Sequence, residues 1–104
     1  MLFRSARPRP KGPKHKHHIV AKAASNPHAV SSRNLLKRFK IGINSSRNLV
    51  LIHRNVHSVM HTKRYYRGVC TFLKQKPINR VNVLNRLAKL KTAIKGIDLA
   101  INPT

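Results

Sequence analysis

Acidic side chains are almost absent from this sequence. Asp98 is the only Asp or Glu among 104 residues, it stands against 23 Lys and Arg, and the formal net charge is +22. A single carboxylate excludes paired acids for general acid–base chemistry and an acidic cluster for magnesium or calcium. So large a charge opposes a compact free state. We therefore expect a polyanionic partner, most commonly nucleic acid, bound through counterion release.

Other chemical features are missing as well. Cys70 is the only cysteine, so no intrachain disulfide can form, and we expect it to be a buried apolar side chain. There is no Gly-rich phosphate loop, and the longest apolar block, residues 49–52, is far too short to cross a membrane. We therefore expect no catalysis and no cofactor, and we interpret the chain as a protein that is not an enzyme.

The composition and the hydrophobic pattern of the sequence predict a small, irregular α+β domain. Hydrophobic residues make up 40% of the chain, which is too much for a wholly disordered tail, whereas aromatic residues make up only 5%. Residues 1–30 are predicted to form an extended basic arm, with a possible partial targeting segment at residues 1–6. Residues 31–97 are predicted to form the domain itself, and residues 98–104 a tail.

The middle of the chain predicts a short helix and a short strand. Ser31 or Ser32 is expected to cap a helix over residues 33–40, which Gly42 ends. Residues 48–52 are β-branched and Leu-rich, and they indicate a short buried strand. Because the run is short, a helix remains the alternative for it.

The C-terminal region predicts an amphipathic helix over residues 77–95. Apolar side chains recur there every three or four residues, Pro77 is a favourable first helical residue, and Gly96 is a favourable stop. The apolar stripe is expected to pack on a neighbouring protein or on three side chains of this chain: Phe39, Leu51 and Phe72.

Seven histidines invite a metal hypothesis. His53, His57 and His61 are spaced four apart, which on a helix places them on one face. Zinc sites usually combine His with Cys or a carboxylate, and neither is available in a matching pattern. We therefore interpret the histidines as groups that bind phosphate and ribose, and we assign no metal ligand. A second group of histidines lies near the N-terminus: His15, His17 and His18.

Two adjacent tyrosines lie between arginines. Tyr65 and Tyr66 stand between Arg64 and Arg67, and aromatic rings flanked by cations can stack on unpaired bases. The alternative is that one ring packs in the core and the other covers a surface, because adjacent side chains on a regular element diverge. The pattern leaves both interpretations open.

Several short segments, taken in order, resemble one known family. Residues 37–41 (Lys-Arg-Phe-Lys-Ile), His53, residues 63–68 (Lys-Arg-Tyr-Tyr-Arg-Gly) and residues 80–84 (Arg-Val-Asn-Val-Leu) are similar to segments of large-ribosomal-subunit protein thirty-five. The resemblance covers roughly residues 32–84. Large-subunit protein twenty-seven is a weaker match, and a cationic membrane-active peptide is a rival of another class.

The resemblance implies a structural constituent of the large ribosomal subunit in a mitochondrion, with a plastid or the bacterial cytoplasm as alternatives. Its implied partners are ribosomal RNA and neighbouring ribosomal proteins, with no membrane and no homo-oligomer. Phosphate contacts of this kind position a protein without reading sequence. The expected RNA-binding residues are Arg4, Arg7, Arg9, Lys11, Lys14, Lys16, Arg33, Lys37, Arg38, Lys40, Arg47, His53, Arg54, Lys63, Arg64, Tyr65 and Arg67.

Overall fold

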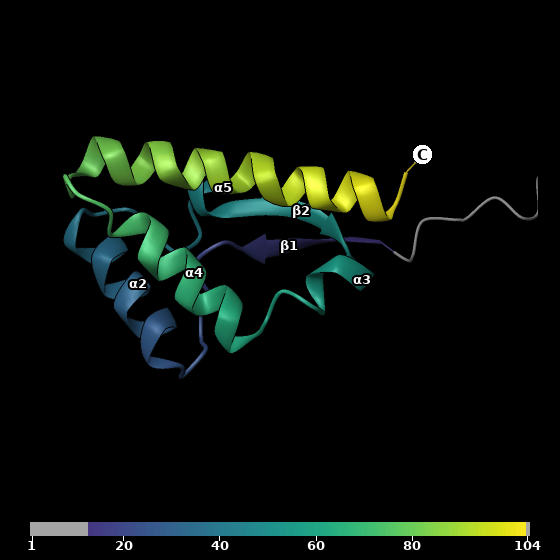
Figure 1. The fold of residues 1–104 in the computed structure, drawn as a ribbon, viewed down its shortest axis with the longest axis horizontal. Coiled ribbons are helices and arrows are strands. Elements are labelled where there is room, and N and C mark those ends of the chain that lie inside the picture. The colour runs from purple at the N-terminus through teal and green to yellow at the C-terminus, as the bar shows by residue number, and fades with distance from the viewer. Residues whose placement is uncertain (1–12, 104) are drawn as a thin grey trace, which may run out of the picture.

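The structure, a computed structural model, describes residues 13–103. Four α-helices and a two-stranded antiparallel sheet form a small α+β fold, which confirms the predicted class (Figure 1). The elements in chain order are β1 (Lys14–His18), α2 (Pro27–Arg38), a 3-10 turn (Ser46–Asn48), β2 (Leu49–His53), α3 (Arg54–His57), α4 (Lys63–Leu73) and α5 (Arg80–Ile101).

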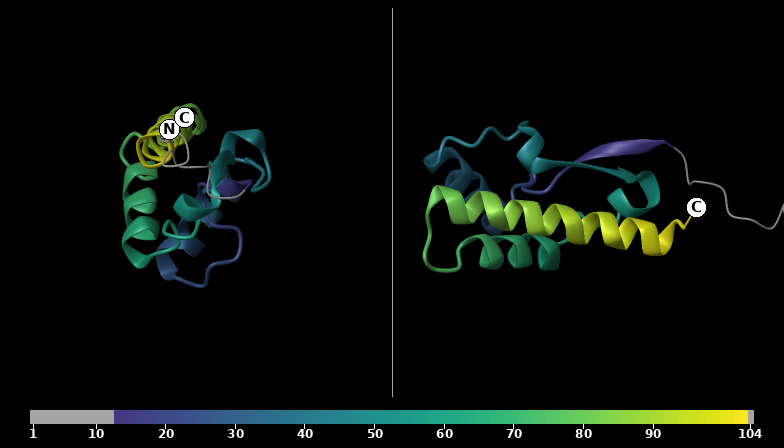
Figure 2. Two further views of the ribbon diagram at one scale, coloured as in Figure 1. Left: turned by 90° about the vertical axis from the view of Figure 1, so that its right-hand side faces the viewer. Right: turned by 90° about the horizontal axis from the view of Figure 1, so that it is seen from above.

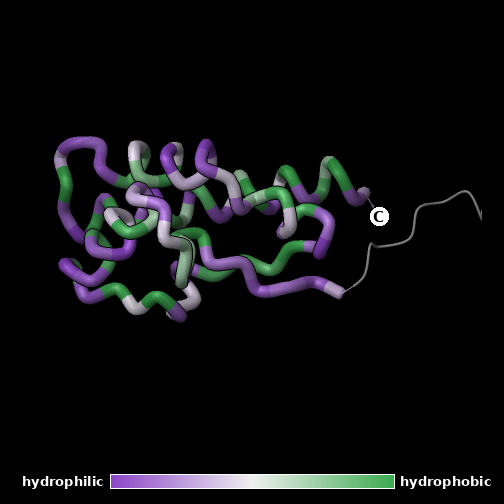
Figure 3. The backbone as a smooth tube through the Cα atoms, turned by 90° about the horizontal axis from the view of Figure 1, so that it is seen from below, coloured by the Kyte–Doolittle hydropathy of each residue, from purple (hydrophilic) through white to green (hydrophobic). Residues whose placement is uncertain are grey.

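The two strands differ in character. Their register runs from Lys14 opposite His53 to His18 opposite Leu49. Strand β1 is hydrophilic and β2 is hydrophobic (Figure 3). Since successive side chains of a strand point to opposite faces, His15 and His17 share one face of β1 and His18 lies on the other.

The buried side-chain amide of Asn48 connects the loop that follows β1 to the loop that precedes β2. The Asn48 side chain accepts a hydrogen bond from the Val20 backbone N–H at 2.8 Å and donates to the carbonyl oxygens of Val20 and Ile43 at 3.2 and 2.9 Å. The Ile19 N–H donates in turn to the Asn48 carbonyl at 2.8 Å. Because Asn48 is fully buried, these bonds are not exchanged with water, and they fix the chain just after His18.

The core lies between the sheet and the helices. Helix α5 runs alongside β2 and also contacts α4, which packs against α2 (Figures 1 and 2). Leu36, Ile52, Leu73 and Leu87 are each at most 1% exposed. Burial of one such side chain contributes about 1.5–3 kcal/mol, so this cluster supplies a large part of the folding free energy. Within residues 13–103, no helix combines the length and apolarity that a membrane span requires.

Helix α2 begins earlier than the sequence pattern predicted. Pro27 is its first residue, and the Asn26 side chain caps it by accepting from the His28 backbone N–H at 2.9 Å. Proline at this position needs no N–H partner, so it begins the helix here instead of breaking it. The helix ends at Arg38, and Lys40 adopts a positive φ of 57°. The predicted cap at Ser31 or Ser32 and stop at Gly42 are therefore wrong.

Helix α5 is shifted toward the C-terminus relative to the prediction of 77–95. Asn79 caps it by accepting from the Asn82 N–H at 2.8 Å, and the helix continues through Gly96 to Ile101. Gly96 does not end the helix because the residues beyond it are held by tertiary contacts, which override a propensity cost of about 1 kcal/mol. The strand predicted at 48–52 is confirmed as β2, one residue later.

The described part of the predicted basic arm contains β1 and the start of α2, and the predicted packing of α5 differs in part from the structure. Residues 1–12 of the arm lie outside the described residues, whereas Lys14–His18 pairs with β2 and Pro27 already starts α2. Leu51 is 53% exposed, because it lies on the same face of the sheet as Lys16, its partner in register. It lines an open groove beside Lys91 and Lys95 of α5 and is not covered by that helix.

The only acidic side chain of the sequence is buried and forms hydrogen bonds within the fold. Asp98 on α5 is 5% exposed, and its carboxylate accepts from the His53 backbone N–H at 3.1 Å and from His53 Nδ1 at 2.9 Å. Next to this pair, Asn102 and Asn55 exchange two amide hydrogen bonds at 3.0 and 3.1 Å. These contacts attach α3 and the end of β2 to the C-terminal turns of α5.

Candidate functional site

Three histidines from separate parts of the chain converge between β1 and α4. They are His17 on β1, His57 at the end of α3, and His61 in the connection to α4, and each offers one ring nitrogen within 4.8 Å of the others. The Nε2 atoms of His57 and His61 lie 3.2 Å apart. A turn after α3, with the Met60 N–H donating to the His57 carbonyl, brings His61 back toward His57.

The cluster has a buried side and an open side. His17 is 0% exposed, His57 is half-buried and His61 is exposed. Burial, reinforced by the positive charges of His57, His61 and His18, lowers the pKa of His17 to about 3. Burial and then the charges of neighbouring histidines also lower the pKa of His57. Both rings are therefore neutral at pH 7, which is the form that binds a metal ion.

Two tyrosines at the start of α4 complete the cluster. Tyr65 Oη lies 2.8 Å from His17 Nε2 and donates to the Ile19 carbonyl at 2.7 Å. Tyr66 Oη lies 3.1 Å from His61 Nδ1. Burial, followed by the charge of Tyr66, raises the pKa of Tyr65 above its ordinary value, so its hydroxyl keeps its proton.

The cluster fits a transition-metal ion. Three imidazole nitrogens are a common ligand set for catalytic zinc, which leaves a fourth position for a substrate or water. His17 Nδ1 is a buried atom without a hydrogen-bond partner among the described residues. Such an atom is costly unless a ligand uses its lone pair. The only carboxylate of the chain is bonded to His53, so the ligand set contains no acid.

The structure regroups the histidines that the sequence pattern had placed together. His53 does not share a helical face with His57 and His61, as the spacing had predicted. It is the last residue of β2, and its ring binds Asp98. His17 takes its place, although forty residues separate it from His57. No spacing rule could have found this ligand, because only the pairing of β1 with β2 brings it near α3.

His18 lies beside the cluster on the other face of β1. Its ring is half-buried, and its Nε2 lies 2.8 Å from Asn44 Oδ1. Because that oxygen can only accept, His18 Nε2 carries the hydrogen and Nδ1 keeps a free lone pair. The imidazole is therefore oriented and can take a proton.

Comparison with known proteins decides between the interpretations of this chain. The model of a nuclease family of the HNH/ENDO VII superfamily with conserved Ala-His-His, abbreviated AHH, matches residues 1–100. The chain belongs to the AHH nuclease family. The adjacent pair His17-His18 is the only His-His in the sequence, and Lys16 precedes it where the family name has Ala. No curated protein and no solved structure matches the chain.

Membership in the AHH nuclease family overturns the ribosomal interpretation. The resemblance to large-subunit protein thirty-five is wrong, and so are the structural ribosomal role, the predicted ribosomal partners and the absence of enzymatic function. Short basic segments such as residues 37–41 and 63–68 arise in any protein that binds phosphates, so they do not identify one family. The mitochondrial location stays a prediction.

The residues expected to bind RNA fall into several groups in the structure. Four of them, Arg4, Arg7, Arg9 and Lys11, lie outside the described residues. Two are occupied internally: the His53 ring is buried against Asp98, and the Tyr65 hydroxyl binds Ile19 and His17. Arg33 donates to the Ala21 carbonyl at 2.9 Å. The exposed residues are Lys14, Lys16, Lys37, Arg38, Lys40, Arg47, Arg54, Lys63, Arg64 and Arg67.

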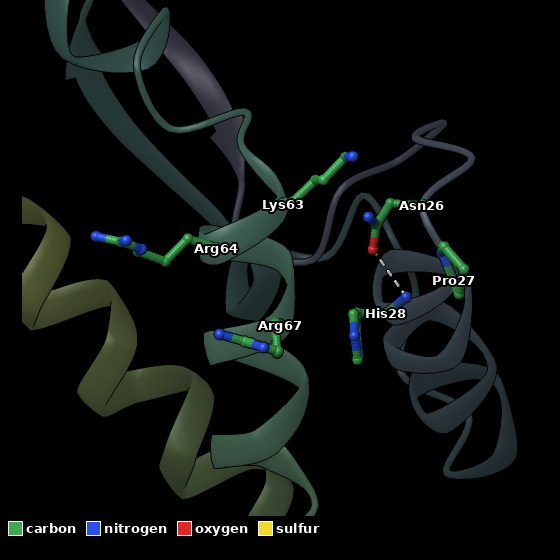
Figure 4. Close-up of a pocket in the computed structure, with 6 residues that line it drawn as sticks. All are labelled: Asn26, Pro27, His28, Lys63, Arg64 and Arg67. Carbon is green, nitrogen blue, oxygen red and sulfur yellow. Dashed lines mark hydrogen bonds between the residues drawn. The ribbon is translucent and has the colours of Figure 1, made fainter.

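The last three of these line an open pocket. The pocket has a volume of about 460 Å³ and lies between the N-terminal ends of α2 and α4 (Figure 4). His28 faces the gap between the helices, while Arg64 and Arg67 extend from one side of α4 (Figure 4). The lining residues are Asn26, Pro27, His28, Lys63, Arg64 and Arg67, with no acid among them.

Proposed function

We propose that this protein is a metal-dependent nuclease that hydrolyses phosphodiester bonds of nucleic acid. His17, His57 and His61 are the metal ligands, and His18 is the proton acceptor. The observation that carries the proposal is the convergence of three imidazole nitrogens within 4.8 Å in a member of a nuclease family. Family membership supplies the reaction class, and the geometry supplies the residues.

The ligand set selects the kind of metal. Three nitrogen ligands without a carboxylate suit zinc, cobalt, nickel or copper, whereas magnesium and calcium require oxygen ligands. When bound, such an ion stabilises the charge that develops on the phosphate in the transition state. The neutral state of His17 and His57 means that loading does not have to displace a proton from these two rings.

His18 is the proposed general base. It neighbours a ligand in the chain, its ring is oriented by Asn44, and its Nδ1 is free to accept a proton. Histidine is the side chain best suited to this role near neutral pH. Because His18 is not one of the three clustered rings, its replacement should leave metal binding intact and affect only the chemical step.

The charge of the protein supplies substrate affinity. Lys63 and Arg64 occupy the first turn of α4, where the helix dipole already provides partial positive charge. Two cations at this end are unfavourable in the free protein and become favourable beside a phosphate. The pocket of Lys63, Arg64 and Arg67 thus binds the substrate backbone, independently of base sequence.

The test is cleavage of plasmid DNA and of single-stranded RNA by the full chain, with zinc, cobalt, nickel or magnesium added. We expect cleavage with a transition metal, and its loss in His17→Ala and His61→Ala. His18→Ala should lose cleavage but keep metal affinity. Asn85→Ala, on the exposed side of α5, is the control. Equal activity in His17→Ala, or activity that requires only magnesium, would refute the proposal.

A further inference from the structure

The consecutive tyrosines of α4 each bind a ring nitrogen of a different candidate ligand. Tyr65 Oη lies 2.8 Å from His17 Nε2, and Tyr66 Oη lies 3.1 Å from His61 Nδ1. The two tyrosine rings are themselves in edge contact, with centroids 5.9 Å apart. One dipeptide therefore touches two of the three metal-ligand rings.

The start of α4 holds this dipeptide rigidly. Thr62 caps the helix: its hydroxyl accepts from the Tyr65 N–H at 3.1 Å, and its carbonyl accepts from the Tyr66 N–H at 3.0 Å. Thr62 also directly follows His61 in the chain. The cap therefore fixes the backbone of both tyrosines next to one of the ligands they contact.

Counting hydrogens assigns the tautomer of His17. The Tyr65 hydroxyl has one hydrogen, and the Ile19 carbonyl, 2.7 Å away, can only accept it. Tyr65 Oη must then accept from His17, so His17 Nε2 carries the hydrogen. The remaining nitrogen, Nδ1, is left with its lone pair, and it is the buried atom that has no partner among the described residues.

At His61 the geometry of the facing histidines selects the other nitrogen. His61 Nε2 faces His57 Nε2 at 3.2 Å, which is the arrangement of two ligand atoms on one ion. His61 Nδ1 lies on the opposite side of the ring, 3.1 Å from Tyr66 Oη, so the hydroxyl can accept the Nδ1 hydrogen when Nε2 faces the ion. Partners of this kind fix the tautomer and orientation of a ligand histidine and increase its basicity.

We propose that Tyr65 and Tyr66 are positioning residues of the metal site, and that they make His17 bind through Nδ1 and His61 through Nε2. This inference rests on the proposed metal-dependent function, which it extends beyond the three ligands. It adds a role for two rings that the sequence pattern left open to base stacking or to packing. Their hydroxyls are committed to the histidines, and the half-buried rings pack beside them.

Nitrogen-15 NMR of the histidine rings in the metal-free protein tests the tautomers directly. We expect His17 as the Nε2–H form and His61 as the Nδ1–H form. Tyr66→Phe should allow the Nε2–H form of His61 to appear, while the His17 signals stay unchanged. The opposite tautomer at either ring in the wild type would overturn the inference, whether or not the protein binds metal.

Zinc and cobalt titrations of the same variants test the consequence. We expect Tyr66→Phe and Tyr65→Phe each to weaken metal affinity by about 10–100-fold, and to change the cobalt absorption spectrum. Thr92→Val, which removes an exposed hydroxyl bonded to the Ala88 carbonyl on α5, is the control and should change neither. Wild-type affinity and spectrum in both tyrosine variants would refute the positioning role and leave the proposed function standing. Failure of the wild type to bind any metal would instead refute the proposed function.

Discussion

Replacement of Asp98 by Asn removes the only carboxylate side chain of the sequence and keeps the shape of the side chain. The carboxylate accepts from the His53 backbone, from the His53 ring and from the Asn102 amide at 3.1, 2.9 and 3.2 Å. A hydrogen bond to a charged group contributes about 1.5–3 kcal/mol. Because Asn keeps one acceptor oxygen, we expect the free energy of unfolding to fall by about 2–3 kcal/mol at pH 7.

The same variant has a defined dependence on pH. Burial raises the pKa of the Asp98 carboxyl, but the hydrogen bonds from the His53 backbone, the His53 ring and Asn102 outweigh burial, and the net pKa lies below its usual value. The unfolded protein therefore binds more protons at this group than the folded protein. The stabilisation is complete above the unfolded pKa of about 3.9 and disappears as the pH falls through the folded pKa.

Urea unfolding of the wild type and Asp98→Asn at pH 7, and at a series of pH values below 4, measures both effects. The difference between the two proteins should be large at pH 7 and should shrink as the pH falls. For a domain whose total stability is about 5–15 kcal/mol, a loss of 2–3 kcal/mol is easily resolved. A difference below about 0.5 kcal/mol at pH 7, which is the usual effect of a surface substitution, would refute the assigned role of Asp98. A difference that persists undiminished in acid would refute the explanation by proton linkage.

Three further changes have measurable consequences. Gly96→Ala should raise the free energy of unfolding by about 1 kcal/mol in thermal or urea melts, because no atom lies within 4 Å of the added Cβ; a loss of stability would show that the helix is strained there. Asn48→Ala should lower it by about 2–4 kcal/mol, since buried partners at Val20 and Ile43 lose their bonds; an unchanged melt would contradict the role of this amide. Replacement of Lys63, Arg64 and Arg67 by Ala should weaken DNA binding and reduce the slope of log K against log salt by about 3; an unchanged slope would place the substrate elsewhere.

Local pattern was sufficient for some elements and not for others. The apolar period predicted the C-terminal helix, and the β-branched run predicted β2. The helix ends were missed where long-range contacts decide them. Gly96 is a favourable stop by propensity alone, but Asp98 and Asn102 form bonds to β2 and α3 that extend the helix by another turn.

The site was accessible from the sequence only in part. The spacing of His57 and His61 was visible, and both are in the cluster. His17 lies beside them because β1 pairs with β2, and no local sequence pattern predicts this long-range pairing. His53 is not in the cluster because its ring binds Asp98. High positive charge pointed to nucleic acid in general, but it carried no information about whether the protein scaffolds that polymer or cleaves it.

Metal stoichiometry tests the central claim most directly. Wild type, His17→Ala and Asn85→Ala would be dialysed against zinc or cobalt at micromolar concentration, and bound metal would be measured per chain by mass spectrometry. The account predicts one ion per chain in the wild type and in Asn85→Ala, and none in His17→Ala. A wild type without metal, or a His17→Ala variant that retains it, would contradict the assignment of the histidine cluster.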